Sequence, residues 1–164
     1  MSNKTDNYGL PLEYQQMAEY FDAHNISDET AAKNSLIERL LKEQNVKTVL
    51  DLTCGTGSQV FYLHEHGYKV TGSDFSPDLI RQAKGKAKAQ GKEITFIDGD
   101  MRELQVGKFD AVITIFNAIG HMSKPDFEKA LQNIYNSLKE GGIYIFDIFN
   151  LQAITDNVID NFKM

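Results

Sequence analysis

Residues 49–57, VLDLTCGTG, decide the fold. An apolar strand is predicted to end at Asp51, and a turn built on Gly55 and Gly57 then leads into a helix expected over residues 58–65. Glycine lets the backbone approach a ligand closely, and the free N–H groups at the start of a helix attract an anionic group. The stretch therefore predicts a site for a nucleotide or an adenosyl group.

Strands and helices alternate along the chain around this stretch. We expect five strands, at residues 48–52, 69–73, 94–97, 111–116 and 143–149. The fourth is a continuous apolar run, which is typical of a strand that is covered on both faces and therefore central in its sheet. The alternation indicates βαβ units and a parallel sheet, so the expected fold class is α/β.

Two of the helices between these strands carry clear end signals. Ser76 is expected to cap one of them, with Pro77 in the first turn and Gly91 beyond the end. The other is expected to begin with a capping-box pattern at Ser123 and to end at the Gly141-Gly142 pair. Helical spacing predicts that the following side chains face inward: Leu79, Ile80, Ala83 and Ala87 in the first helix, and Phe127, Ala130, Leu131, Ile134 and Leu138 in the second.

The length of 164 residues fits one domain around a single core. Residues 1–10 are polar and without periodicity, so we expect a flexible arm. The rest is expected to form one domain with three parts, namely two N-terminal helices (11–45), a ligand-binding core (46–150) and a tail (151–164).

Composition and charge disfavour several classes of partner. The formal net charge is -6, so bulk electrostatics does not favour nucleic acid. The sequence contains no apolar run long enough to cross a membrane, and the single cysteine, Cys54, cannot form an internal disulfide. We expect a cytoplasmic protein without membrane contact. His64 and His66 do not share a helix face, so no metal site is expected.

Further acidic residues follow the predicted strands, where a parallel sheet gathers its ligand-binding loops. Asp74 comes seventeen residues after Gly57, at the end of the second strand, where a carboxylate can accept hydrogen bonds from two ribose hydroxyls. Asp100 and Met101 follow the third strand, and we expect Asp100 to accept from an adenine amino group while Met101 covers the ring. The third glycine of the dinucleotide fingerprint is missing, which favours S-adenosylmethionine over a nicotinamide cofactor.

In the order of these segments, residues 46–150 resemble the class I S-adenosylmethionine-dependent methyltransferases. The resemblance implies a Rossmann-like doubly wound sheet with strand order 3-2-1-4-5. It also implies that the methionine portion is held by the turn from Asp51 to Gly57, the ribose by Asp74 and the adenine beside Asp100. The cofactor contacts expected on this basis are Tyr14, Tyr20, Asp51, Leu52, Thr53, Gly55, Gly57, Asp74, Phe75, Ser76, Gly99, Asp100, Met101, Phe116 and Asn117.

The chain departs from that family in its length. Class I enzymes usually continue past the fifth strand with two more strands, whereas this sequence ends at Met164, so we expect those two strands to be missing. We expect a truncated chain, the alternative being a partner that supplies the missing wall. The fifth strand would then be a sheet edge, which predicts possible self-association.

Three functions remain open from the sequence. The first is methyl transfer by in-line displacement to a small-molecule acceptor, with S-adenosylhomocysteine as product and His121 as the candidate base. The second is a non-catalytic domain that binds S-adenosylmethionine or a partner. The third, less favoured, is an NAD-type oxidoreductase, which would need a hydride-handling site that the sequence does not reveal.

Overall fold

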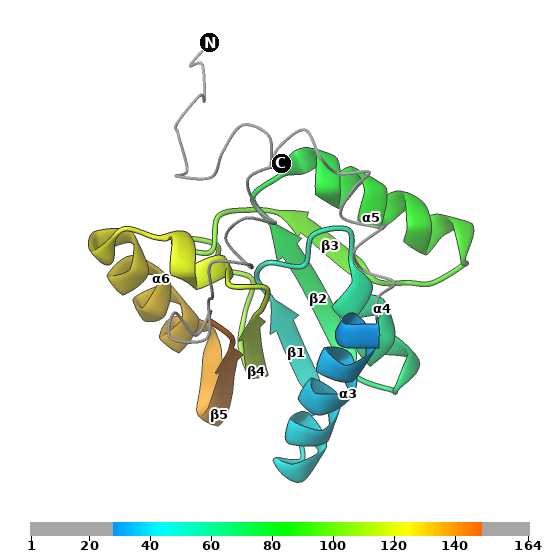
Figure 1. Ribbon diagram of the computed structural model, residues 1–164, viewed down its shortest axis with the longest axis horizontal. Coiled ribbons are helices and arrows are strands. Elements are labelled where there is room, and N and C mark those ends of the chain that lie inside the picture. The colour runs from blue at the N-terminus through cyan, green and yellow to red at the C-terminus, as the bar shows by residue number, and fades with distance from the viewer. Residues whose placement is uncertain (1–27, 149–164) are drawn as a thin grey trace, which may run out of the picture.

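The structure is a computed structural model that describes residues 28–148 (Figure 1). Its strands are β1 (Thr48–Asp51), β2 (Lys69–Asp74), β3 (Thr95–Asp98), β4 (Phe109–Thr114) and β5 (Leu138–Phe146). Its helices are α3 (Asp28–Glu43), α4 (Ser58–Glu65), α5 (Pro77–Ala89), the short 3-10 helix η1 (Ala118–His121) and α6 (Lys124–Ser137). The expected flexible arm, Tyr14, Tyr20 and the tail lie outside the described residues.

The five strands form one parallel sheet in the order β3-β2-β1-β4-β5, which confirms the predicted strand order. In this sheet Asp51 pairs with Gly72 of β2 and Ile113 of β4, and Asp74 pairs with Asp98 of β3. All strand arrows point the same way in Figure 1. The residues that end the strands therefore gather along one edge.

Alternate residues of the central strands face opposite layers of helices. Val49 and Ile113 belong to a core cluster that contains residues of α3, α4 and α5. Leu50 and Val112 belong to a second cluster, with Ala130 of α6. Figure 1 shows α6 on one side of the sheet and α3, α4 and α5 on the other. The sheet is thus covered on both faces, as the apolar run in β4 predicted.

The predicted signals at the start of α5 are present in the structure. The Ser76 hydroxyl accepts from the backbone N–H of Leu79 at 3.5 Å, and Pro77 occupies the first turn. The four side chains predicted to face inward, Leu79, Ile80, Ala83 and Ala87, are all buried. In α3, Ile37 is buried while Leu36 is exposed.

The end of α6 was predicted wrongly. The helix ends at Ser137 rather than at the glycine pair, and β5 begins at once with Leu138. Pairing with β4 shifts between Phe109↔Leu138 and Ala111↔Ile143, so residues 139–142 bulge out of the ladder and Gly141 takes a left-handed φ of 74°. The glycines therefore serve the bulge instead of the helix end. Leu131, expected to face inward, is 37% exposed.

No helix among the described residues is long and apolar enough to cross a membrane.

Candidate functional site

The turn after β1 opens onto unfilled space. The glycine at its tip, Gly55, has a φ of 54°, and a Cβ placed there would meet no heavy atom within 4 Å. Gly57 differs, because a Cβ there would lie 2.9 Å from the Phe61 ring. Gly57 is thus required by packing, whereas Gly55 leaves room for a ligand against the backbone.

Asp51 is fully buried beside this turn and is only partly satisfied. One carboxylate oxygen accepts from the backbone N–H of Thr53 at 3.1 Å. The other oxygen, Oδ2, is buried without a hydrogen-bond partner, as is the whole side-chain amide of Gln59 in the first turn of α4. Leaving a buried polar group unpaired costs about 1–3 kcal/mol, so these atoms on both sides of the glycine turn fit a polar ligand.

Asp74 reaches the same turn from the neighbouring strand. Its Oδ2 accepts from the backbone N–H of Gly55 at 2.9 Å, and its Oδ1 accepts from that of Ser76 at 2.9 Å. Asp74 is 6% exposed. The structure therefore brings together the glycine turn and the two acidic residues that the sequence singled out.

Burial raises the cost of ionising both carboxylates. Burial raises the pKa of Asp51 from 3.8 to about 7, with the Asp74 carboxylate adding to the rise. Burial likewise raises the pKa of Asp74 to about 6, with Asp98 adding to it and the Ser76 and Gly55 N–H groups opposing it. A buried acidic pair suits a ligand that brings a positive charge or hydroxyl donors.

Four other predicted contact residues lie around this centre. Leu52 is buried in the α6-side core cluster. The Thr53 hydroxyl accepts from the backbone N–H of Ile115 at 3.2 Å and so joins the turn to the end of β4. Phe75 is half-buried between Asp74 and the cap of α5. The fourth, Gly99, donates its N–H to the Asp74 carbonyl at 3.0 Å.

Asp100 has a protein partner that the sequence did not reveal. Its carboxylate binds the Arg102 guanidinium through Nε at 2.9 and 3.0 Å and through one terminal nitrogen at 2.5 Å. The other terminal nitrogen of Arg102 donates to Asp126 of α6 at 2.8 Å. Met101 is buried in the α6-side core. The Asp100 carboxylate is therefore held in a fixed orientation at the end of β3.

The loop after β4 is strained. Phe116 was expected inside the strand, but β4 ends at Thr114, and Phe116 and Asn117 both adopt left-handed φ values, of 60° and 58°. Phe116 is 44% exposed. Nearby, His121 is exposed, and its Nε2 lies 3.4 Å from the side-chain nitrogen of Asn117.

Two residues that sequence reasoning missed hold this loop. The Asp147 carboxylate, directly after β5, accepts from the Asn117 N–H at 2.7 Å and from Lys33 Nζ of α3 at 2.7 Å. Lys33 Nζ also lies 4.4 Å from the centre of the Phe116 ring. Asp147 could have been recognised from the sequence, because, like Asp51, it is an acidic residue at the end of an apolar strand.

Cys54 is buried within the glycine turn, and burial raises the pKa of its thiol well above 9.0. The thiol is therefore neutral and poorly nucleophilic. Within residues 28–148 no group of three histidine, cysteine or acidic side chains is arranged to hold a metal ion.

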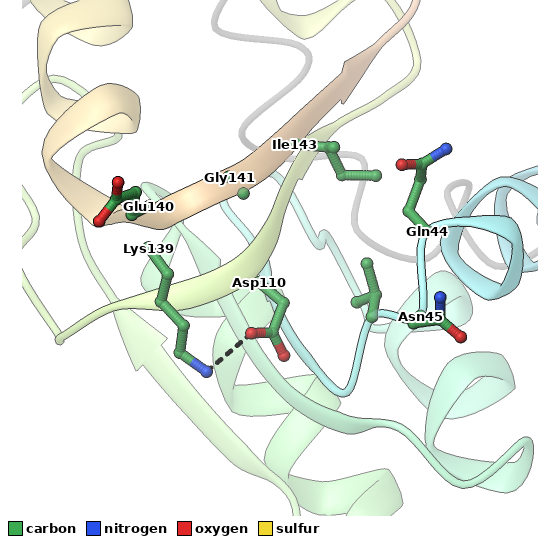
Figure 2. A pocket seen from close by; sticks show the side chains of 9 residues that line it. Gln44, Asn45, Asp110, Lys139, Glu140, Gly141 and Ile143 are labelled. Atoms are coloured by element: carbon green, nitrogen blue, oxygen red, sulfur yellow. Dashed lines mark hydrogen bonds and ion pairs between the residues drawn. The ribbon is translucent and has the colours of Figure 1, made fainter.

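A separate polar hollow of about 140 Å³ lies at the opposite edge of the sheet (Figure 2). Its lining includes Asn45 and Val46 before β1, Asp110 early in β4 and Lys139 in the bulge of β5. Lys139 Nζ donates to Asp110 at 2.8 Å, the contact that Figure 2 draws as a dashed line. Parallel sheets bind ligands at the carboxyl ends of their strands, and this hollow lies at the amino ends.

Known proteins resemble this chain in sequence. Residues 49–142 match the family model described as a methyltransferase domain. The glycine/sarcosine N-methyltransferase of Parasynechococcus marenigrum (strain WH8102) is 35% identical over 129 residues, which cover 76% of this chain and 46% of that protein. The demethylmenaquinone methyltransferase of Thermus thermophilus is 39% identical over 107 residues, covering 63% and 47% respectively.

Solved structures show the same fold. An S-adenosylmethionine-dependent methyltransferase from Clostridium acetobutylicum ATCC 824 is 27% identical, with a TM-score of 0.71, over 82% of this chain and 57% of that one. DesVI of Streptomyces venezuelae, 22% identical with a TM-score of 0.75 over 85% and 61%, shares the fold. The chain spans about half the length of the curated relatives that it matches. The family match covers more than half of the sequence, and the chain belongs to the class I S-adenosylmethionine-dependent methyltransferases.

Proposed function

We propose that this chain binds S-adenosylmethionine at the carboxyl edge of its sheet and transfers the methyl group to a small-molecule acceptor. The observation that carries the proposal is the convergence of Asp51, Gly55 and Asp74 around one open turn, with the Gly55 N–H bonded to Asp74 at 2.9 Å. In this proposal residues 46–150 are the cofactor-binding core, with the N-terminal helices at 11–45 and the tail at 151–164 completing the domain.

The residues around the turn fit the two polar ends of the cofactor. Asp51 Oδ2 is the one buried carboxylate oxygen left without a partner in residues 28–148, and it would accept from the methionine ammonium. Each oxygen of Asp74 accepts one backbone N–H and keeps a lone pair for a ribose hydroxyl. Gly55 would lie against the methionine portion, where any larger side chain would intrude.

The remaining contacts extend along the strand ends. Asp100, fixed by Arg102, would accept from the adenine amino group, next to Gly99 and Met101. The backbone at Phe116 and Asn117 would border the methionine portion. The side of the site next to the glycine turn would be formed by Leu52, Thr53, Phe75 and Ser76. Tyr14 and Tyr20, which lie outside the described residues, would cover the cofactor.

Bound S-adenosylmethionine supplies an activated methyl group. The protein's contribution is to orient the reactants and to exclude water, and good orientation lowers a barrier by about 7–11 kcal/mol. His121 is the proposed base for a protonated acceptor, because it is exposed beside Asn117. A small-molecule acceptor is supported by the acidic net charge and by the relatives whose names specify glycine, sarcosine or demethylmenaquinone.

Calorimetric titration with S-adenosylhomocysteine tests cofactor binding. The wild-type chain should bind at one saturable site, and Asp74→Asn should weaken binding about tenfold or more, since it replaces a charged acceptor of two ribose hydroxyls. Asp78→Asn is the matched control, because Asp78 is an exposed carboxylate on α5. Equal affinity of both variants, or no binding by a folded wild-type chain, would reject the site.

A non-catalytic adenosyl-binding domain is the second candidate. Measuring S-adenosylhomocysteine release across amine, hydroxyl and carbon acceptors separates it from an enzyme, because the non-catalytic domain would bind without turnover. An NAD-type site would instead bind NADH, with a saturable change in NADH fluorescence.

We also propose that the chain self-associates through the β5 edge of its sheet. Within the described residues β5 pairs only with β4, and Phe146 and Ile148 at its end are exposed. Light scattering over a range of concentrations should show a dimer, and a constant monomer mass would reject this proposal.

A further inference from the structure

The turn at Phe116 and Asn117 needs support from the rest of the molecule. Two consecutive non-glycine residues in the left-handed region are uncommon, and for a bulky residue such as Phe116 the conformation is strained. Strain of this kind persists only where surrounding contacts over-determine the backbone. The contacts that hold this turn therefore indicate its role.

Asp147 provides that support from its position directly after β5. Its two oxygens take separate partners, Oδ1 the N–H of Asn117 and Oδ2 the ammonium of Lys33, each at 2.7 Å. Lys33 in turn lies 4.4 Å from the Phe116 ring centre, within reach of a cation–π interaction. The side chains of Lys33 and Asp147 are 25% and 33% exposed, so the pair is partly shielded from solvent.

We infer that Asp147 and Lys33 are positioning residues, which form a clamp that sets the Phe116–Asn117 turn in the geometry that receives the methionine portion of the cofactor. This inference rests on the proposed function, because the turn borders the proposed site. The clamp joins three elements at the carboxyl edge, namely α3, the end of β4 and the end of β5.

If the pair had a purely structural role, its removal would unfold the sheet. Asp147 joins the ends of β4 and β5, and these two strands are also held together by the parallel ladder between them. Removing the clamp should therefore release the turn while the sheet stays folded. The chain also offers a matched control, since Lys139 and Asp110 form a second ion pair between β5 and β4 at the opposite edge.

The test compares Asp147→Ala, Asp147→Asn, Lys33→Met, Lys33→Arg and Lys139→Met. Amide hydrogen exchange at Asn117 and S-adenosylhomocysteine affinity are measured on each, with urea unfolding to verify the fold. Asp147→Ala should speed Asn117 exchange and weaken binding, each by roughly tenfold, because a charge-assisted hydrogen bond is lost. Asp147→Asn should be milder, because its amide oxygen still accepts from Asn117.

The lysine variants complete the test. Lys33→Met should weaken binding several-fold, and Lys33→Arg should restore it, because the guanidinium keeps the charge. Unchanged exchange and affinity in both Asp147→Ala and Lys33→Met would overturn the clamp, as would an equal loss in Lys139→Met. Should the wild-type chain fail to bind S-adenosylhomocysteine, the proposed function fails, while faster Asn117 exchange in Asp147→Ala and Lys33→Met would still support the clamp.

Discussion

Asp51 should make the ligand-free protein less stable as pH rises. Its carboxyl is fully buried and has one oxygen without a partner, and burial raises its pKa from 3.8 to about 7. Between these two values the unfolded chain gives up the proton while the folded protein keeps it, so the folded state loses stability as pH rises. Above about pH 7 the penalty is complete, and below pH 3.8 it is absent.

The size of the effect follows from the two pKa values. Each pH unit within this window is worth about 1.4 kcal/mol, which gives a full penalty of about 4 kcal/mol. Asp51→Asn removes the ionisation but adds a buried amide, whose cost does not change with pH. The stability difference, variant minus wild type, should therefore rise by about 3 kcal/mol between pH 5 and pH 8.

Urea unfolding at pH 5 and pH 8 measures this difference directly. Asp74 titrates in both proteins and cancels to first order, and Asp78→Asn controls for the loss of a surface charge. Asp51→Asn should also weaken S-adenosylhomocysteine binding, since the ammonium loses its carboxylate partner. A stability difference that is the same at the two pH values would refute the reasoning.

The other predictions concern the two glycines, the thiol and the opposite edge. Gly55→Ala should cost about 1–2 kcal/mol of stability for its left-handed backbone and should abolish most cofactor affinity in calorimetry, whereas Gly57→Ala should destabilise more strongly in urea, because its methyl group meets Phe61. The buried Cys54 thiol should react with a disulfide reagent only on unfolding, and rapid labelling of the native protein would contradict its raised pKa. Hydrogen bonds from Lys139 and Thr48 hold the pKa of Asp110 below its usual range, so Asp110→Asn should lower the stability at pH 7 by about 1–3 kcal/mol. In thermal melts this loss of stability should shrink as the pH falls below 4. Cofactor affinity should stay unchanged.

The alternation of strands and helices was predictable because its signals are local, whereas the strand order came from the family resemblance. Helix α4 has the bounds expected from the sequence, since Gly57 and Gly67 mark its two ends. Asp51 and Asp74 each end a strand, and parallel pairing of β1 with β2 brings the two ends together. Hydrophobic periodicity and the glycines at the ends of elements were therefore sufficient to predict these features.

What the sequence did not reveal depends on tertiary contact. Lys33 and Asp147 lie 114 positions apart, and no pattern pairs them. The apolar side chain of Phe116 predicts the end of a β-strand, but its backbone is left-handed and belongs to the turn that Asp147 binds. The glycine pair after α6 resembled a helix end, and only the pairing shift with β4 shows that it belongs to a bulge.

A crystal structure of the chain with S-adenosylhomocysteine bound tests the central claim most directly. The ribose hydroxyls should lie within about 3 Å of the Asp74 carboxylate, the ammonium at Asp51 Oδ2, and the methionine portion against Gly55. Density for the ligand at another place, or at this edge with its ribose turned away from Asp74, would contradict the account.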